Sequence, residues 1–505
     1  MKHTKLSRRQ VLGISLAAAL PVSNSHAASN TSDTQFDRRV DAVVVGAGMA
    51  GLTAACELAR KGVKTLLIEK RSWFGGDGIL STGTIFAAQT EFHERDNVRE
   101  GISVEDYWKR LNAGLDDEPL SKVRDNLPES IIYSGIAKHD PSVLRACVEV
   151  SPEVTGFIAS FGIEFLKINP EKPFLISTAP GSMSKLADGL MKRILSSHGE
   201  ILAQTSVEHL ITSDNGAVQG VFCRDREGKT LSIGAQAVIL ATGGFLDNQD
   251  LMRHYKRYWA VAPKGFHSVE DDLPKDHTGD GIVMARRIGA ALEDMESVPK
   301  FYTATRQGIP NFSWMIFDTE SAYAVNRNGR RFVNEHEARY SGCALTMLRE
   351  KIDGGYVLFD DKTMNGVNAR RWHFAEMLES GGLFKADSVE QLARLAGVSP
   401  EGLAATVDRI NKDAALGVDS EFGRQDPLFR PLEAPFYLSA PYWPVMFKTE
   451  GGIEVNRNFQ VLRHSDLSPI PGLYAIGATC GSISTRLCDV FASGLLVARN
   501  RISGI

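Results

Sequence analysis

The clearest pattern of apolar and polar positions begins near residue 40. Two apolar runs, 40–45 and 64–68, flank a segment in which apolar residues recur at helical spacing. Short apolar runs favour buried strands, and a recurrence every three or four residues favours a helix. A Gly-x-Gly-x-x-Gly turn that begins at Gly46 stands between the first run and the helix. The pattern therefore predicts a strand, a glycine turn, a helix and a second strand followed by Glu69.

Four further stretches carry patterns of secondary structure. Residues 205–245 alternate as in a short β-meander, and its last strand runs into a Thr-Gly-Gly turn at 242–244. A glycine turn at 278–281 predicts the start of a helix, and small residues predict another helix from Ala492. Residues 100–200 predict mainly helix with polar breaks. Because glycines after an apolar strand let the backbone rest against a dinucleotide, the turn at 242–244 is a candidate binding element.

The first glycine turn has the spacing of a dinucleotide-binding motif. Glycines there allow a sharp turn and close approach to a pyrophosphate, and the helix N-terminus presents N–H groups to the anion. Glu69 lies 23 residues after Gly46, where a carboxylate can accept hydrogen bonds from ribose hydroxyls. A second cluster at 75–83 contains further glycines and small residues, which let the backbone approach a flat ring or a phosphate. These residues predict an adenine-dinucleotide site.

The N-terminal residues predict an export signal. Arg8 and Arg9 precede the apolar run Val11–Leu20, which is followed by a proline and small residues. This order is typical of a twin-arginine signal peptide, here residues 1–27, and residues 28–37 would form a flexible leader. A disordered basic tail explains neither the apolar run nor the small residues. We therefore expect a periplasmic protein that leaves the cytoplasm already folded around its cofactor.

Composition narrows the possible partners. The 505 residues suffice for two or three domains, and beyond the signal no segment reaches the roughly 18 apolar residues of a membrane span. A net charge of −4 gives no indication of nucleic-acid binding. Six scattered cysteines are expected to be buried free thiols. With no Cys-x-x-Cys pair, neither a metal site nor a covalent haem is predicted, so electrons must be exchanged with another molecule.

The order of these segments predicts an α/β fold with an insertion. The dinucleotide pattern occupies 38–297, and glycine-rich apolar strands of the same style return at 446–505. The intervening block, 298–445, is rich in aromatic residues and arginines. A Rossmann-like nucleotide domain interrupted by an inserted α+β capping domain explains this order.

Seven segments resemble the flavoprotein family of soluble fumarate reductases, succinate dehydrogenase flavoprotein subunits and 3-ketosteroid dehydrogenases. They are Gly46–Gly51 with Glu69, Gly75-Gly76, Ala241–Gly244, Thr278–Gly281, Arg330–Glu335, Gly451-Gly452 and Pro471–Gly477. The resemblance implies bound FAD, with its isoalloxazine ring between the nucleotide domain and a mobile cap. No histidine stands in the family's attachment setting, so we expect the FAD to be non-covalent. The residues predicted to bind it are Gly46, Ala47, Gly48, Gly51, Glu69, Lys70, Gly75, Gly76, Ser81, Thr82, Gly83, Val207, Ala241, Thr242, Gly243, Asp280, Gly477 and Ser493.

The resemblance also implies catalytic residues. Arg339 stands four residues after Arg-Phe-Val-Asn-Glu, where the fumarate reductases carry their proton donor, and Arg486 matches the arginine that binds a substrate carboxylate. Arginine suits the second task because its fork binds carboxylate bidentately. Thr319 and Glu320 resemble the family's proton-relay and carboxylate-binding pair.

Three departures alter the expected substrate site. Lys448 replaces the histidine that binds a substrate carboxylate. As a point charge it can still bind an anion, and it is a candidate catalytic residue, but Glu450 beside it would oppose that anion. Residues 298–300 contain no match for the histidine that opens the family's cap. Cys488 and Asp489 replace Gly-Gly after the second arginine's leucine. These changes leave fumarate itself open as the substrate.

The leading hypothesis is a periplasmic FAD-dependent reductase of the C=C bond of an α,β-unsaturated carboxylate. The electron partner would be a cytochrome c or a quinol-linked protein. The alternative is desaturation of a ketone or cyclic acid in the manner of the ketosteroid dehydrogenases, although their Tyr-Pro-Gly-Pro-Gly signature is absent. A third possibility is a non-catalytic flavin protein that transfers electrons.

Overall fold

The structure is a computed structural model of the 505-residue chain, and it separates residues Met1–Phe36 from a unit formed by Asp37–Ile505. The predictions of a signal peptide, Thr82 and Arg339 lie outside the described residues. The structure describes residues 35–81, 83–112, 139–170, 173–179, 181–257, 277–297, 299–304, 316–338, 341–366, 369, 372–484 and 486–500.

The predicted strand, glycine turn, helix and second strand are confirmed. They are β1 (Arg38–Val45), α1 (Met49–Arg60) and β2 (Thr65–Ile68). The two strands pair in parallel, with Val45 opposite Ile68. All four residues of β2 are buried, as expected of a strand covered on both faces.

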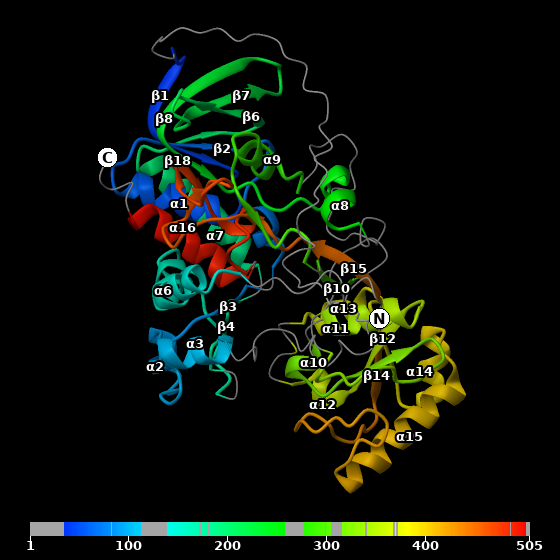
Figure 1. The fold of residues 1–505 in the computed structure, drawn as a ribbon. Coiled ribbons are helices and arrows are strands. Elements are labelled where there is room, and N and C mark those ends of the chain that lie inside the picture. Colours follow the sequence, from blue (N-terminus) through cyan, green and yellow to red (C-terminus); the bar gives the residue numbers. More distant parts are fainter. Residues whose placement is uncertain are drawn as a thin grey trace, which may run out of the picture. The chain divides into compact units, whose positions relative to one another are not determined.

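These strands belong to a larger sheet, in which β18, β8, β1 and β2 lie side by side and are all parallel. The predicted β-meander is confirmed, because β6, β7 and β8 pair antiparallel in chain order (Figure 1). Parallel strands present their carboxyl ends at one edge, which therefore becomes the place to look for a ligand. The other strands of this sheet are β5 (Glu200–Leu202), β6 (Thr205–Thr212), β7 (Val218–Asp225), β8 (Thr230–Leu240), β17 (Gln460–Leu462) and β18 (Pro469–Ala475).

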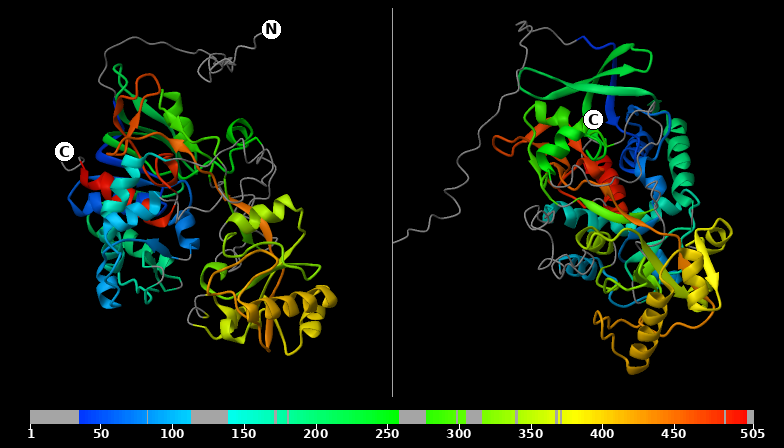
Figure 2. Two further views of the ribbon diagram at one scale, coloured as in Figure 1. Left: turned by 60° about the horizontal axis from the view of Figure 1, so that its bottom comes forward. Right: turned by 90° about the vertical axis from the view of Figure 1, so that its right-hand side faces the viewer.

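Helices α1 and α16 (Leu487–Asn500) pack against each other, and their blue and red ribbons stay together in both views of Figure 2. The prediction that this last helix begins at Ala492 was wrong by five residues. Val490 N–H already donates to Arg486 O, which closes the first turn. Residues 100–200 are mainly helical where the structure describes them, as predicted. Elements there and nearby are η1 (a 3₁₀ turn, Gly76–Leu80), β3 (Thr84–Phe86), α2 (Glu91–Arg95), α3 (Val104–Asn112), α6 (Pro141–Ala159), β4 (Leu175–Ser177) and α7 (Ser182–Ser196).

The segment from 316 to 442 has its own antiparallel sheet, in the order β11-β12-β14-β13. Residues on β12 (Gly355–Asp360) alternate between two apolar clusters: Val357 and Phe359 join one, and Tyr356 and Leu358 join the other. Both faces of the sheet are therefore buried, and this is the α+β organisation predicted for the cap. The other elements are α10 (Ile316–Thr319), β11 (Tyr323–Asn326), α11 (Ser341–Arg349), α12 (Asp361–Met364), α13 (Phe374–Glu379), β13 (Leu383–Ala386), α14 (Val389–Ala396), α15 (Pro400–Leu416) and β14 (Phe436–Ser439).

The chain enters and leaves this segment through a two-stranded antiparallel ribbon. It consists of β10 (Lys300–Ala304) and β15 (Trp443–Lys448), with Lys300 opposite Lys448 (Figure 1). The domain boundary expected between residues 445 and 446 falls inside β15. Nearby elements are α8 (Gln249–Tyr255), α9 (Asp280–Arg287), β9 (Leu292–Glu293), β16 (Gly452–Ile453) and η4 (a 3₁₀ turn, Gly477–Thr479).

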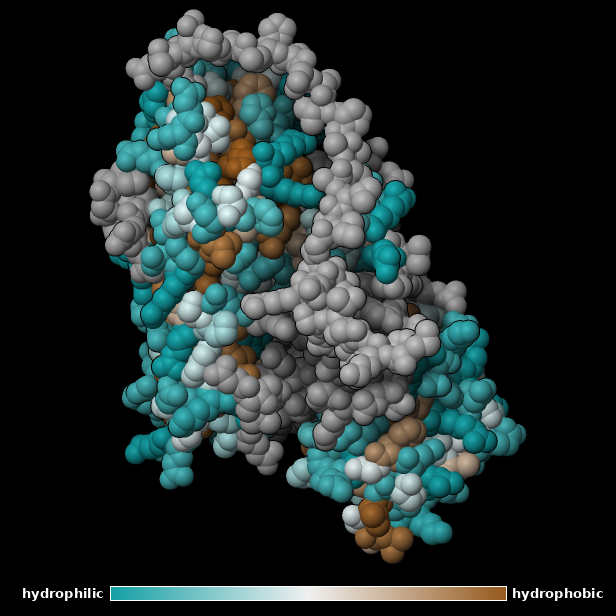
Figure 3. Space-filling view, in the orientation of Figure 1, coloured by the Kyte–Doolittle hydropathy of each residue, from teal (hydrophilic) through white to brown (hydrophobic). Residues whose placement is uncertain are grey.

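All six cysteines are buried and free, in agreement with the prediction. In the described part of the chain no helix is long and apolar enough to cross a membrane. The face drawn in Figure 3 carries hydrophobic residues scattered among hydrophilic ones.

Candidate functional site

The carboxyl ends of four neighbouring parallel strands define the candidate site. Gly46 follows β1, Glu69 follows β2, Ala241 follows β8, and Gly477 lies two residues beyond β18. All four residues are among those predicted to bind FAD. The topology brings them together because their strands are adjacent and point the same way.

The first glycine turn is built for close approach. A Cβ on Gly46 would lie 2.4 Å from Ala241 O, and one on Gly51 would lie 1.9 Å from Gly46 O. A Cβ on Gly48, by contrast, would meet nothing within 4 Å. Gly48 is the N-cap of α1, whose first turn contains no acidic residue. Open space beside the Gly48 backbone, at a helix N-terminus with no acidic side chain, is what a pyrophosphate requires, so these residues fit a dinucleotide.

The carboxylate of Glu69 is oriented by the same turn. Its Oε2 accepts from Ala47 N–H at 2.7 Å and its Oε1 from Arg71 N–H at 3.0 Å. Burial raises the pKa of Glu69, and these backbone donors oppose the rise. A carboxylate has about four acceptor positions, so two bonds leave capacity for ribose hydroxyls.

Two other predicted cofactor residues bind each other. Lys70 Nζ donates to Asp280 Oδ2 at 2.9 Å and to Thr278 Oγ1 at 2.6 Å. Gly279, with φ +68°, is the N-cap of α9, so the predicted helix start at this glycine turn is confirmed. The contact ties the end of β2 to the start of α9.

Side chains behind the strand ends fix the remaining turns. Thr479 Oγ1 accepts from Gly243 N–H at 2.8 Å, and Ser493 Oγ accepts from Gly477 N–H at 3.1 Å. Thr479 was not predicted, and only its position in the turn after β18 could have indicated it. Val207 is buried in β6 opposite Cys223, where it packs within the sheet.

The second glycine cluster joins the first. Gly75, with φ +105°, donates its N–H to Ala47 O at 2.7 Å. Ser81 lies in the turn after η1, where its Oγ donates to Gly78 O at 2.8 Å. Asp77 lies in η1, and its Oδ1 is 2.8 Å from Nε2 of His277. The loop predicted to approach a flat ring is therefore attached to the dinucleotide turn.

Lys448, the residue in place of the family's histidine, lies in a group of charged side chains. Burial lowers the pKa of Lys448, while the charges of Asp77 and Glu450 oppose the shift. Glu450 is 3% exposed, and its carboxylate lies 3.2 Å from Lys300 Nζ and 3.7 Å from His139 Nε2. The expected opposition of Glu450 to an anion is therefore reduced by the positive charge of Lys300.

Arg486 is placed at the start of α16. Its Nε donates to Asp489 Oδ2 at 3.1 Å, and its guanidinium carbon lies 5.8 Å from the ring centroid of Phe86. Phe86 is on β3, the strand that follows the second glycine cluster. Both predicted carboxylate contacts, Arg486 and Lys448, thus lie near the chain that begins at Gly75.

The other predicted catalytic residues belong to the segment between β10 and β15. Glu320 is 8% exposed and directly follows α10, which ends at Thr319. The Arg-Phe-Val-Asn-Glu motif that precedes Arg339 is held by buried ion pairs.

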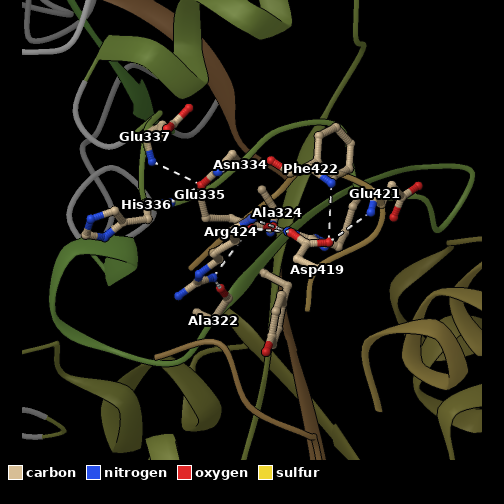
Figure 4. Close-up of polar contacts among 12 residues, drawn as sticks. Ala322, Ala324, Asn334, Glu335, His336, Glu337, Asp419, Glu421, Phe422 and Arg424 are labelled. Atoms are coloured by element: carbon tan, nitrogen blue, oxygen red, sulfur yellow. Dashed lines mark hydrogen bonds and ion pairs between the residues drawn. The ribbon is translucent and has the colours of Figure 1, made fainter. Parts of the chain in front are cut away.

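The buried ion pairs form what we call the Arg331–Arg424 network, defined by Arg331, Glu335, Asp419, Arg424 and Asp426. Figure 4 labels three of its members, Glu335, Asp419 and Arg424. Every side chain in the network is at most 5% exposed. Burial alone would raise the pKa of Asp419, but the hydrogen bonds and charge of Arg331 outweigh it, and the pKa is lowered. Arg424 lowers the pKa of Asp426 in the same way, so both aspartates keep their charge at neutral pH.

A buried lysine, Lys256, holds the two chain segments that continue into the β10–β15 ribbon. Its Nζ donates to the carbonyl and hydroxyl oxygens of Ser297, before β10, and to Glu450 O at 2.9 Å, after β15. Lys256 is 1% exposed, and burial lowers its pKa to about 7. Sequence patterning could not reveal this residue, because its partners are 41 and 194 positions away.

Replacement of Lys256 by methionine is expected to destabilise the protein by about 2–4 kcal/mol, because buried oxygens lose their donor. Thermal unfolding followed by circular dichroism measures the effect. Lys61→Met is the matched control, since Lys61 Nζ also donates to a backbone carbonyl, Ala498 O at 2.9 Å, away from the ribbon. Equal shifts of Tm in the two variants would contradict a special role for Lys256.

Comparison with known proteins identifies the family. The family model described as FAD binding domain matches residues 41–489. The chain belongs to this family. FAD is therefore its cofactor, the protein is an FAD-dependent oxidoreductase, and the glycine turns, Glu69 and the N-terminus of α1 are the residues that would hold the dinucleotide.

Relatives and solved structures agree with this assignment. Urocanate reductase of Eggerthella lenta is 29% identical over 490 residues, covering 91% of this chain and 74% of its own. NADH:fumarate oxidoreductase of Klebsiella pneumoniae is 28% identical over 477 residues, 92% of this chain and 47% of the longer relative. The open conformation of a flavocytochrome c3 fumarate reductase has a TM-score of 0.68 at 24% identity and covers 93% of this chain and 78% of that one. The last similarity shows the fold: a nucleotide domain with an inserted cap.

Proposed function

We propose that the protein reduces the C=C bond of an α,β-unsaturated carboxylate. Held by the glycine turns and Glu69, FAD in its reduced form would supply the N5 hydride for the carbon β to the carboxylate and would become oxidised by two electrons. Arg339 delivers the proton to the α carbon, and Arg486 binds the carboxylate through its guanidinium fork. The negative charge that develops on the carboxylate side of the substrate is met by fixed cations, which lowers the barrier.

The placement of Arg486 carries this proposal. Its guanidinium lies beside β3, directly after the glycine cluster predicted to contact the flavin. Asp489 orients the side chain, which is 12% exposed. An arginine so fixed is ready to accept a carboxylate with little loss of rotamer freedom. The reductases of urocanate, fumarate and acrylate among the relatives support the same substrate class.

Lys448 adds positive charge to the same region. It stands opposite Lys300 in the β10–β15 ribbon, and Glu450 balances part of their charge. Lys448 can therefore pair with an anionic substrate group, although the charge of Asp77 also acts on it.

Export by the twin-arginine route to the periplasm is part of the proposal, supported by Arg8, Arg9 and the apolar run that follows them. The electron donor would then be a cytochrome c or a quinol-linked protein. Cytochrome-linked fumarate reductases of Shewanella frigidimarina are among the relatives, at 26% identity.

Desaturation of a ketone is the second candidate. A 3-oxosteroid 1-dehydrogenase of Mycolicibacterium smegmatis is 26% identical over 537 residues, and this chain covers 91% of it. The same hydride geometry run in reverse would oxidise a saturated ketone. Arg339 after the Arg-Phe-Val-Asn-Glu motif favours reduction.

Stopped-flow reoxidation of the dithionite-reduced protein separates these functions. Urocanate, fumarate, acrylate and cinnamate are mixed anaerobically with the reduced protein, and a 3-oxosteroid is mixed with the oxidised protein. We expect at least one enoate to restore flavin absorbance at rates above 1 s⁻¹, a typical lower bound for enzyme turnover. Bleaching by the steroid with no response to enoates would instead establish the desaturase. No response to either class would support a non-catalytic flavin protein.

A further inference from the structure

The loop after α15 is bonded to the motif that precedes Arg339. Arg331 donates to both oxygens of Asp419, at 2.9 and 3.0 Å, and to both oxygens of Glu335, at 2.9 and 2.7 Å. Arg424 donates to Glu335 Oε2 at 3.3 Å and to Ala322 O at 2.9 Å. Figure 4 shows Asp419, Arg424 and Glu335 converging from these separate segments. Residues more than 80 positions apart therefore share one buried cluster.

The same loop fixes the backbone that leads to residue 339. Asn334 Nδ2 donates to Phe422 O at 3.1 Å, and Asn334 Oδ1 accepts from the N–H groups of His336 and Glu337 (Figure 4). Ala338 N–H donates to Asn334 O at 2.9 Å, and Ala338 O accepts from Cys343 N–H. The described backbone is thus held up to the residue directly before Arg339.

Stability alone does not explain so many buried charges. A buried ion pair gains in Coulomb energy about what it loses in hydration, and apolar residues of similar volume often stabilise a core as well. Two guanidinium forks do something that apolar contacts cannot, because each bidentate pair fixes the direction as well as the distance of its partner. The arrangement is suited to holding one segment in one orientation.

We propose that Asp419 and Arg424 are positioning residues for proton delivery by Arg339. They act through Arg331 and Glu335, which set the course of the backbone before the acid. The inference rests on the proposed function, because it takes Arg339 as the proton donor. It assigns a role in the reaction to a loop that no motif marks.

The cap contains a matched control for this proposal. Asp360 forms a bidentate pair with Arg430, at 2.6 Å for both hydrogen bonds, and its side chain is 1% exposed. The side chain of Asp360 is as buried as that of Asp419. Its partner Arg430 belongs to a segment outside the 331–338 motif. Asp419→Asn and Asp360→Asn each remove one buried carboxylate charge. Asp419 is bonded to the 331–338 motif, whereas the partner of Asp360, Arg430, lies outside it.

The experiment compares these two variants as purified holoproteins with the enoate that reoxidises the wild-type flavin fastest. For Asp419→Asn we expect kcat to fall about 10–100-fold with KM changed less than threefold, since small misplacement of a reacting group costs this much. The solvent deuterium isotope effect on reoxidation should increase, because proton transfer becomes slower than hydride transfer. Asp360→Asn should lower Tm by a similar amount and keep kcat within twofold.

Equal losses of kcat in both variants, or a wild-type isotope effect in Asp419→Asn, would overturn the proposal. If Asp419→Asn does not retain FAD, Arg424→Lys is used in its place, because lysine keeps the buried positive charge and removes the guanidinium fork. A wild-type kcat in Arg424→Lys would also overturn the proposal. Arg339→Lys is measured in parallel. If no enoate reoxidises the reduced wild-type flavin, the proposed function fails. If Arg339→Lys retains turnover, Arg339 is not the proton donor and the positioning role fails with it. If Arg339→Lys is inactive while Asp419→Asn and Arg424→Lys are normal, only the positioning role fails.

Discussion

Arg339→Lys should retain bound FAD and lose about three orders of magnitude in turnover of an enoate, within the range measured for removal of a general acid. Lysine keeps the positive charge but replaces a planar fork by a single, differently placed ammonium group. Loss of activity would then reflect the geometry of proton delivery rather than the net charge of the site. Steady-state reduction of the best enoate, together with the visible spectrum of the purified protein, measures both quantities.

The control for this variant is Arg330→Lys. Arg330 belongs to the same motif, is exposed, and makes no ion pair among the contacts that the structure describes for it. Turnover of this control should remain within twofold of wild type. Turnover above one tenth of wild type in Arg339→Lys would remove Arg339 from the mechanism.

The local part of the site could be predicted from sequence because its residues lie in one short stretch of the chain. Gly46 and Glu69 belong to one strand, turn, helix and strand unit, and the spacing of that unit fixes their separation in space as well as in sequence. The helix start at Gly279 was predictable for the same reason, since a glycine at the N-cap is a local signal. Thr278 and Asp280 then meet Lys70 because their elements share the edge of the parallel sheet.

The distant part of the site could not be predicted. Lys256 looks in the sequence like any lysine at the end of a helix, and only the path of two other segments turns it into a buried donor. Asp419 and Arg424 lie in a polar loop whose composition suggests a solvated turn, yet their side chains are fully buried. Burial of a charged residue depends on partners supplied by the tertiary fold, and a single sequence does not specify those partners.

Two hydroxyl residues near the strand ends also show what a single sequence cannot predict. Ser493 was predicted to bind the cofactor, and its hydroxyl accepts from Gly477 N–H, within the turn after β18. Thr479 binds Gly243 N–H in the same way, and its position in the turn after β18 is its one sequence signal. A small hydroxyl residue near a glycine turn can therefore serve the ligand by fixing the backbone, and sequence alone does not distinguish this role from direct contact.

The second large effect, on FAD content and stability, is expected for substitution of Gly46. Gly62 is its control, because the two glycines separate the cost of backbone strain from the cost of a close contact. Both glycines have positive φ, +81° and +103°. A Cβ on Gly62 would meet nothing within 4 Å. Gly62→Ala should therefore cost only about 1–2 kcal/mol of left-handed backbone strain and keep stoichiometric FAD.

Gly46→Ala should lose FAD and destabilise the protein by about 3–5 kcal/mol, from backbone strain together with steric overlap. The new Cβ would lie 2.4 Å from Ala241 O, so the ends of β1 and β8 would have to move apart. The dinucleotide turn follows directly after β1 and packs against the end of β8. Separation of the two strand ends would therefore also displace Ala47, whose N–H donates to Glu69. Flavin content from the absorbance ratio at 450 and 280 nm and Tm by differential scanning fluorimetry measure the outcome. Stoichiometric FAD in Gly46→Ala, with Tm equal to that of Gly62→Ala, would show that the close contact between β1 and β8 is not what builds the binding site.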